Sequence, residues 1–186
     1  MARTESAMIA LGTQAPGFDL EDVTTGQRRS LEQVRGELGL LVMFICRHCP
    51  FVKHVEKELA ALGNEHVGKG VGMVAISSND ADCYSEDSPP ALRQQAEELG
   101  FNFPYLYDES QDVARAYNAA CTPDLFLFDK HLKLVYRGQL DDSRPGNATP
   151  VTGRDLREAL NAILKGAPIS GEQKPSIGCN IKWRHS

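Results

Sequence analysis

Short stretches of apolar residues along the chain, either alternating with polar ones or uninterrupted, predict a series of strands. The alternation over 17–23 is followed by Thr24-Thr-Gly26 and returns towards Leu31, which is typical of a β-hairpin. Uninterrupted apolar runs over 38–45 and 71–76 predict two strands that are buried on both faces of a sheet. The same reasoning predicts later strands over 103–107, 123–128 and 132–136.

Helical spacing of apolar residues separates these strands. The stripe that runs from Val52 to Leu62 predicts a helix, which Gly63 can end. Ser88, followed by two prolines, opens a second helix, and Gly100 stops it. Two further helices are predicted over 112–117 and 152–164.

The order of these elements indicates an α/β fold. A hairpin is followed by β-α-β-α, a short insert and β-β-α, which fits a mixed central sheet with helices on both faces. We expect one domain over 15–165, preceded by an N-terminal arm over 1–14. Residues 166–186 read as an irregular tail. Its apolar residues, among them the only tryptophan, Trp183, predict that the tail packs back onto the domain.

Composition and charge exclude several classes of protein. The chain has 186 residues, of which 41% are hydrophobic and 24% charged, as in an ordinary globular domain. A net charge of −5 gives no electrostatic attraction to nucleic acid or to an anionic membrane. The longest apolar run, 38–45, is far shorter than the ~20 residues of a membrane span. The N-terminus shows no signal sequence, so we expect a cytoplasmic protein whose thiols are mostly reduced.

The strongest chemical signal is Cys46-Arg47-His48-Cys49, which lies between a predicted buried strand and a predicted helix. Thiol–disulfide exchange needs a reactive thiolate and a second thiol that releases the mixed disulfide. The helix N-terminus, together with Arg47 and His48, is expected to lower the pKa of Cys46. A stabilised thiolate favours the dithiol, so the pair is expected to oxidise more strongly than one with a neutral spacer.

Pro50 fixes where the helix after this motif begins. Proline has no backbone N–H, so Pro50 belongs in the first turn, and the helix starts between Cys46 and Pro50. We therefore expect Cys49 to point inward and to be less exposed than Cys46.

Two other readings of the cysteines remain open. A Cys-x-x-Cys pair can be half of a zinc site, but none of the other cysteines or histidines has the paired spacing of a second half, so no metal is expected. The pair could also be core cysteines that pack as small apolar residues. Cys121, two residues before Pro123, either lies near the pair or only packs, and Cys179 either exchanges with Cys46 or Cys49 or only packs.

Five segments together resemble the alkyl hydroperoxide reductase/thiol-specific antioxidant (AhpC/TSA) superfamily of thioredoxin-fold proteins, in its peroxiredoxin-like group with a Cys-x-x-Cys motif. They are Ala15-Pro-Gly-Phe-Asp-Leu20, Val42-Met-Phe-Ile-Cys-Arg-His-Cys-Pro-Phe51, Thr122-Pro-Asp-Leu-Phe-Leu-Phe-Asp129, Val135-Tyr-Arg-Gly138 and Pro175-Ser-Ile-Gly-Cys-Asn-Ile-Lys-Trp183.

This resemblance implies a three-layer thioredoxin-like fold with an N-terminal hairpin extension and no cofactor. It implies Cys46 as nucleophile, Cys49 as resolving thiol, and a cis peptide between Thr122 and Pro123 that faces them. The backbone of Thr122 would then hydrogen-bond an extended substrate in strand fashion. The implied partners are protein or small-molecule thiols and disulfides, with peroxides in a peroxidase.

The sequence departs from the superfamily at two positions that matter for peroxide chemistry. Peroxiredoxins carry Pro-x-x-x-Thr-x-x-Cys, whereas Met43 stands at the Thr position here and Gly39 at the Pro position. Arg137 is the candidate for their distant arginine, and a surface arginine is the other explanation. We therefore predict a thiol–disulfide oxidoreductase. The alternatives are a thiol peroxidase with Cys46 as the peroxidatic residue, or a non-catalytic thioredoxin-like module that binds a peptide.

Overall fold

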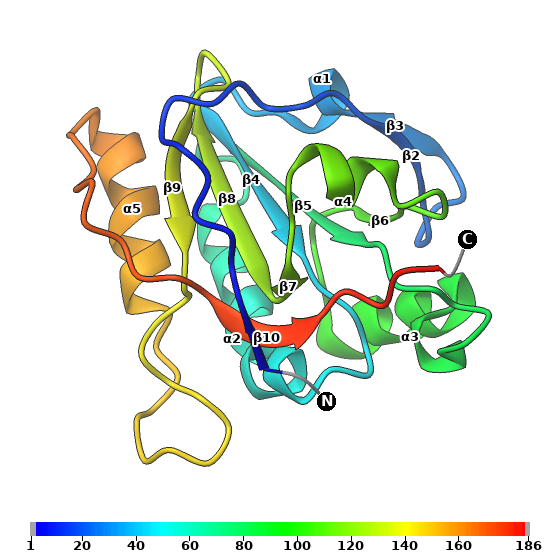
Figure 1. The fold of residues 1–186 in the computed structure, drawn as a ribbon. Helices are drawn as coiled ribbons and strands as arrows, with labels where there is room; N and C mark the ends of the chain where they lie inside the picture. The colour runs from blue at the N-terminus through cyan, green and yellow to red at the C-terminus, as the bar shows by residue number, and fades with distance from the viewer. Residues whose placement is uncertain (1–2, 185–186) are drawn as a thin grey trace.

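The computed structural model describes residues 3–184; residues 1–2 and 185–186, which belong to the expected arm and tail, lie outside the described residues. Its centre is a seven-stranded mixed sheet (Figure 1). In spatial order the strands are β3 (Arg28–Ser30), β2 (Asp19–Asp22), β6 (Tyr105–Tyr107), β5 (Val71–Ser77), β4 (Gly39–Phe44), β8 (Asp124–Asp129) and β9 (Leu134–Gly138).

The two uninterrupted apolar runs form the middle of this sheet. β4 pairs in parallel with β5 on one side and antiparallel with β8 on the other. All six residues of β4 are buried, because both faces of the strand are covered. Its side chains alternate between two apolar cores, with Met43 in one and Phe44 in the other. The site therefore follows a strand that is buried along its whole length.

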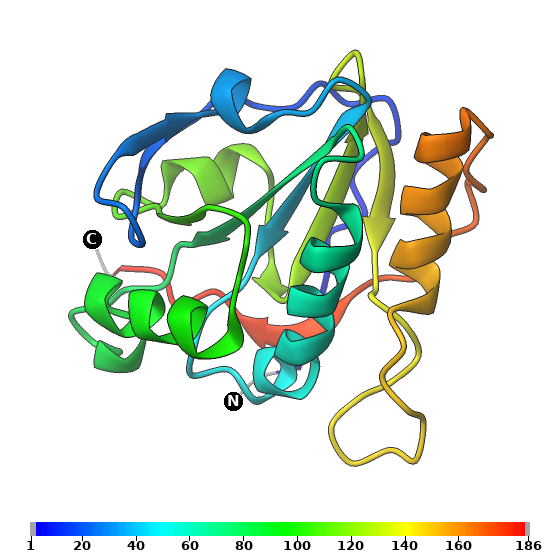
Figure 2. The same cartoon turned by 180° about the vertical axis from the view of Figure 1, so that it is seen from behind.

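Helices cover both faces of the sheet, which confirms the predicted α/β class (Figure 2). On one face lie α2 (Pro50–His66), α3 (Pro89–Leu99) and α5 (Arg154–Lys165). The other face is covered by α1 (Leu31–Val34) and α4 (Asp112–Ala116), while a 3-10 turn, η1 (Ser85–Asp87), precedes α3. Within residues 3–184 no helix has both the length and the apolar character that crossing a bilayer requires.

The predicted elements form with shifts at their ends: the strand expected over 132–136 is Leu134–Gly138, and the one expected over 103–107 is Tyr105–Tyr107. β2 and β3 form the expected hairpin, and Gly100 ends α3 in the left-handed conformation, with φ 66°. Gly63, however, does not end α2, which continues to His66. A Cβ at position 63 would lie 2.5 Å from Oδ1 of Asn102, so this glycine serves close packing and not termination.

The tail is not irregular, as the sequence suggested, but contains a strand. β10 (Ile177–Asn180) lies between β1 (Arg3–Glu5) and β7 (Cys121–Thr122) in a second, three-stranded sheet. In Figure 1, β10 (red) crosses the end of the molecule where α2 begins, and β10 packs against α2. The tail therefore reaches the segment that carries the two cysteines.

Candidate active site

The Cys-x-x-Cys motif occupies the turn between β4 and α2, as predicted. Cys49 is the N-cap of α2 and Pro50 is its first residue, so proline stands where no backbone N–H donor is needed. The carbonyl of Cys49 accepts the first helical hydrogen bond, from the N–H of Lys53 at 3.0 Å. The strand end and the helix start thus fix the backbone on both sides of Arg47 and His48.

Both sulfurs of the motif lie in the interior. Cys46 and Cys49 have 0% of their surface exposed, so the expectation that Cys46 is the more exposed of the two is wrong. Both are free thiols, and their side chains hydrogen-bond to each other. The two thiols therefore interact with each other, which is what a dithiol–disulfide pair needs.

Thr122 faces the two cysteines from a part of the chain more than 70 residues away. The peptide bond between Thr122 and Pro123 is cis, as the resemblance implied. The Thr122 hydroxyl lies 3.4 Å from Sγ of Cys46. Its carbonyl oxygen lies 3.2 Å from Sγ of Cys49, which donates to it when protonated. One residue thus contacts both sulfurs.

Asp87, at the end of η1, is a site residue that sequence reasoning missed. Its fully buried carboxylate accepts the backbone N–H groups of Arg47 and His48, at 2.8 and 3.0 Å. The second oxygen accepts Nδ2 of Asn79 at 2.8 Å and contacts Nδ1 of His48. This carboxylate holds the loop between the cysteines in place. No periodicity or motif around Ser85-Glu-Asp-Ser88 marks it in the sequence.

The side chains of Arg47 and His48 do not act as the sequence suggested. The Arg47 guanidinium points away from Cys46, towards α3, where it donates to the carbonyl of Ala91 at 2.6 Å. His48 is bound to Asp87, stacks on Tyr84 at 5.1 Å between ring centroids, and lies 3.9 Å from Sγ of Cys46. The carboxylate of Asp87, partnered by His48, thus lies beside Cys46, whereas the guanidinium of Arg47 does not.

The electrostatic consequence is the reverse of the predicted one. Burial raises the pKa of the Cys46 thiol well above its ordinary value, and Cys49 and Asp87 raise it further. The hydrogen bond from Cys46 lowers the pKa of Cys49 to about 4, with smaller contributions from Cys179 and Thr122. The pair thus holds one negative charge on Cys49, at the N-terminus of α2, where the helix dipole favours it.

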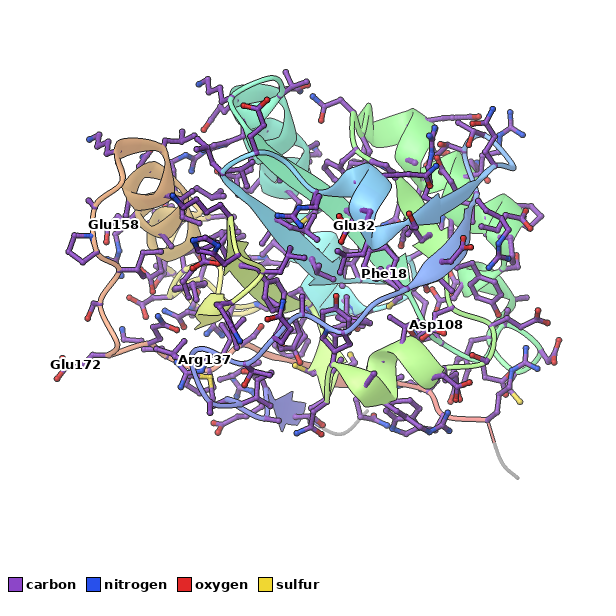
Figure 3. The ribbon with its side chains drawn as sticks, turned by 90° about the horizontal axis from the view of Figure 1, so that it is seen from above. Phe18, Glu32, Asp108, Arg137, Glu158 and Glu172 are labelled. Atoms are coloured by element: carbon purple, nitrogen blue, oxygen red, sulfur yellow. The ribbon has the colours of Figure 1, made fainter. Side chains whose placement is uncertain are left out.

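The structure places the three remaining candidate residues at different distances from the cysteine pair. Cys179 lies on β10 and hydrogen-bonds to Cys49, so it belongs to the site. Cys121 is buried on β7 with its sulfur 3.6 Å from the carbonyl of Pro123, one residue beyond the contact with the pair. Arg137 does not reach the pair: it lies on β9, the edge strand of the sheet (Figure 3), and binds the carbonyl of Ile9 and the side chain of Gln173.

A second buried carboxylate lies just beyond the cis peptide. Asp124 accepts the N–H of Ala120 at 3.0 Å, and its Oδ1 has no hydrogen-bond partner within residues 3–184. Burial raises the pKa of Asp124 to about 7. Asp124 points into the core opposite to that of the cysteines, because its strand partner is Phe44. It therefore anchors the loop before Pro123 and does not contact the sulfurs.

Three side chains of the site could in principle meet one metal ion. Donor atoms of Cys46, His48 and Asp87 all lie within 4.8 Å of one another. The carboxylate, however, already accepts four hydrogen bonds from the loop and from Asn79. Hydrogen bonding within the protein therefore accounts for this cluster.

The chain resembles known proteins in sequence. The model of the AhpC/TSA family matches residues 11–137. Thiol-disulfide oxidoreductase ResA from Geobacillus kaustophilus (strain HTA426) is 30% identical over 132 residues, which cover 69% of this chain and 68% of that protein.

Solved structures resemble most or all of the chain. The crystal structure of an uncharacterized conserved protein from Geobacillus kaustophilus is 58% identical, with a TM-score of 0.98 over 100% of this chain and 98% of that one. The thioredoxin domain of a thiol-disulfide oxidoreductase from Bacteroides vulgatus shares the fold at 21% identity, with a TM-score of 0.64 over 84% and 99% of the two chains. A thioredoxin-like fold and a family match over most of its length show that the chain belongs to the AhpC/TSA family.

Proposed function

We propose that this thiol–disulfide oxidoreductase works through Cys46 as nucleophile and Cys49 as resolving thiol, on disulfides of other proteins. The observation that carries the proposal is the mutual contact of the two buried thiols beside Thr122. The motif also favours the Cys-x-x-Cys subgroup within the family. The proposed substrate class follows the printed name of the ResA relative.

The chemistry needs only the atoms of the two side chains and the substrate. Cys49 takes the proton of Cys46 through their hydrogen bond, and the Cys46 thiolate attacks one sulfur of the substrate disulfide. The substrate S–S bond breaks, a Cys46–substrate disulfide forms, and the second substrate sulfur leaves with the electron pair and takes up a proton. Cys49, again a thiolate, then attacks Sγ of Cys46 and closes the Cys46–Cys49 disulfide. The Cys46–substrate bond breaks, and the remaining substrate sulfur leaves with its electron pair as a thiolate, so that two electrons have passed to the substrate.

Burial sets a condition on this reaction. Because neither sulfur is exposed, a partner disulfide reaches Cys46 only after a local opening of the structure. Opening also hydrates Cys46, which removes the largest cause of its raised pKa. Access and activation of the nucleophile are therefore coupled in this proposal.

The test is reduction of insulin disulfides with dithiothreitol as electron donor. We expect Cys46→Ser to lose turnover, and Cys49→Ser to accumulate a mixed disulfide with insulin through Cys46. Cys83→Ser is the control, because Cys83 is an exposed thiol outside the site. Full turnover in Cys46→Ser would contradict the assignment.

The two alternatives are less favoured. A peroxidase needs groups that orient the peroxide. Met43 and Gly39 stand where peroxiredoxins have threonine and proline, so the threonine hydroxyl is missing. Arg137 binds Ile9 and Gln173 and is not near Cys46. We therefore expect slow consumption of hydrogen peroxide with a thiol donor. A binding module would hold a peptide along Thr122, but β10 already pairs there.

A further inference from the structure

A third cysteine lies beside the redox pair. Cys179 pairs with Thr122 across the β10–β7 ladder, and the carbonyl of Thr122 lies 3.2 Å from the sulfur of Cys49. Cys46, Cys49 and Cys179 belong to one buried cluster, and the thiol of Cys49 interacts with those of both Cys46 and Cys179. Cys49 is thus the residue that contacts both of the other two cysteines.

The structure holds β10 firmly on the cis-proline loop. Gly178 lies so close that a Cβ on it would stand 1.9 Å from the oxygen of Thr122. On one side, the Ser176 hydroxyl donates to the carbonyl of Pro123 at 2.6 Å. On the other, the N–H of Lys182 donates to Oδ1 of Asn79 at 2.8 Å. Cys179 is therefore fixed beside Cys49, with 2% of its surface exposed, and is not carried on a loose tail.

We propose that Cys179 is a third redox-active residue, which takes over the disulfide of the Cys46–Cys49 pair and stores it as Cys49–Cys179. This inference rests on the proposed function, because that function forms the Cys46–Cys49 disulfide in the first place. It adds a second disulfide state in which Cys46 is again a free nucleophile.

The transfer is an internal exchange without net oxidation or reduction. The Cys179 sulfur, as thiolate, attacks Sγ of Cys49 and forms the Cys49–Cys179 bond. The Cys46–Cys49 bond breaks, and its electron pair goes to Cys46, which takes up the proton that Cys179 has lost. No external oxidant or reductant takes part in this step.

While the Cys46–Cys49 pair is reduced, Cys179 is protonated. Burial raises the pKa of Cys179 to about 12, and the hydrogen bond and negative charge of Cys49 contribute to this. When Cys49 is bound to Cys46 in a disulfide, it carries no charge, so these two contributions vanish. Oxidation of the pair therefore makes Cys179 a better nucleophile.

The test maps disulfides in the full-length protein after equilibration in glutathione redox buffers. Acid quenching and N-ethylmaleimide block free thiols before digestion with trypsin. Cleavage after Arg47 separates Cys46 from Cys49, and Cys179 lies on a third peptide, 166–182. We expect wild type to yield both the Cys46–Cys49 and the Cys49–Cys179 links. Cys46→Ser is expected to yield Cys49–Cys179 as its main link.

Matched variants separate this proposal from the proposed function. Cys179→Ala should lose the Cys49–Cys179 link and keep Cys46–Cys49, whereas Cys121→Ser, a buried thiol on the neighbouring strand, should keep both. The near-ultraviolet circular dichroism of each variant checks its fold. If Cys46–Cys49 forms and insulin is reduced, but neither wild type nor Cys46→Ser yields Cys49–Cys179 at any glutathione ratio, the inference is overturned and the proposed function stands. If neither link forms in wild type, both are overturned.

Discussion

Replacing Gly178 with alanine tests whether the close packing of β10 on Thr122 and Pro123 keeps the cysteines buried. The added Cβ would lie 1.9 Å from the oxygen of Thr122, 2.6 Å from its carbonyl carbon and 3.2 Å from the nitrogen of Pro123. All three are backbone atoms, so no side-chain rotation relieves the contact. β10 must therefore move away from β7 to accept the methyl group.

The cost follows from what this movement breaks. Overpacking of a well-packed interior costs about 1–3 kcal/mol. The shift also weakens the β10–β7 ladder, at about 1 kcal/mol for each hydrogen bond. We expect the free energy of unfolding to fall by about 3 kcal/mol if the strand stays attached. If β10 detaches locally instead, the fraction of molecules in which β10 has separated from β7 rises by up to about 100-fold.

Two measurements and one control distinguish these outcomes. Urea denaturation gives the free energy of unfolding. The rate at which a chromogenic aromatic disulfide labels the four buried thiols reports opening, with exposed Cys83 as the internal reference. Gly171→Ala is the matched control, because its Cβ would meet nothing closer than 4.0 Å, and we expect a change within about 0.5 kcal/mol. The reasoning is refuted if Gly178→Ala matches wild type in both stability and labelling.

Three further predictions concern the buried carboxylates and the redox pair. Burial raises the pKa of Asp124 from 3.8 to about 7, so the folded state keeps a proton that the unfolded chain releases, and this contribution to stability is lost as pH rises through that range. In the wild type this lowers the free energy of unfolding by at most about 4 kcal/mol between pH 4 and pH 7.5. Asp124→Asn should remove this difference, as measured by urea denaturation at the two pH values. Asp87→Ala should lower the free energy of unfolding by more than about 2 kcal/mol, because it leaves buried N–H groups of the loop unpaired, whereas exposed Glu86→Ala should change it by less than about 0.5 kcal/mol; equal effects would contradict the role of Asp87. The stabilised Cys49 thiolate favours the dithiol, so we expect a reduction potential above the roughly −270 mV of thioredoxin in glutathione titrations, and a value at or below it would contradict this.

The elements that hold the site were predictable because each has a strong local signal. The run over 38–45 has no polar residue, which predicted a strand buried on both faces, and the strand is β4. The stripe from Val52 to Leu62 and the missing N–H of Pro50 placed α2 and its start. The cis peptide before Pro123 came from the resemblance and not from local pattern.

The electrostatics of the site could not be predicted, because they depend on contacts between distant segments. Asp87 reaches the loop from 39 residues beyond His48, and only the packing of η1 brings it there. The sequence shows that Arg47 is next to Cys46 in the chain. It does not show that the Arg47 guanidinium turns away from Cys46 to donate to the carbonyl of Ala91 and to the side chain of Gln94 on α3. β10 has four residues and β7 has two, which is too short for an alternating pattern to show.

The position of β10 makes two events at Thr122 mutually exclusive. The resemblance implies that an extended substrate pairs with the backbone of Thr122, but Cys179 holds that position in the ladder. A substrate that pairs there must first displace β10, and it thereby removes Cys179 from Cys49 and ends the burial of the pair. With β10 in place, the pair is enclosed by the chain's own residues, Thr122 and Cys179 among them; with β10 displaced, Cys46 meets solvent and substrate. Exchange with a partner and exchange with Cys179 therefore belong to two different states of the same strand.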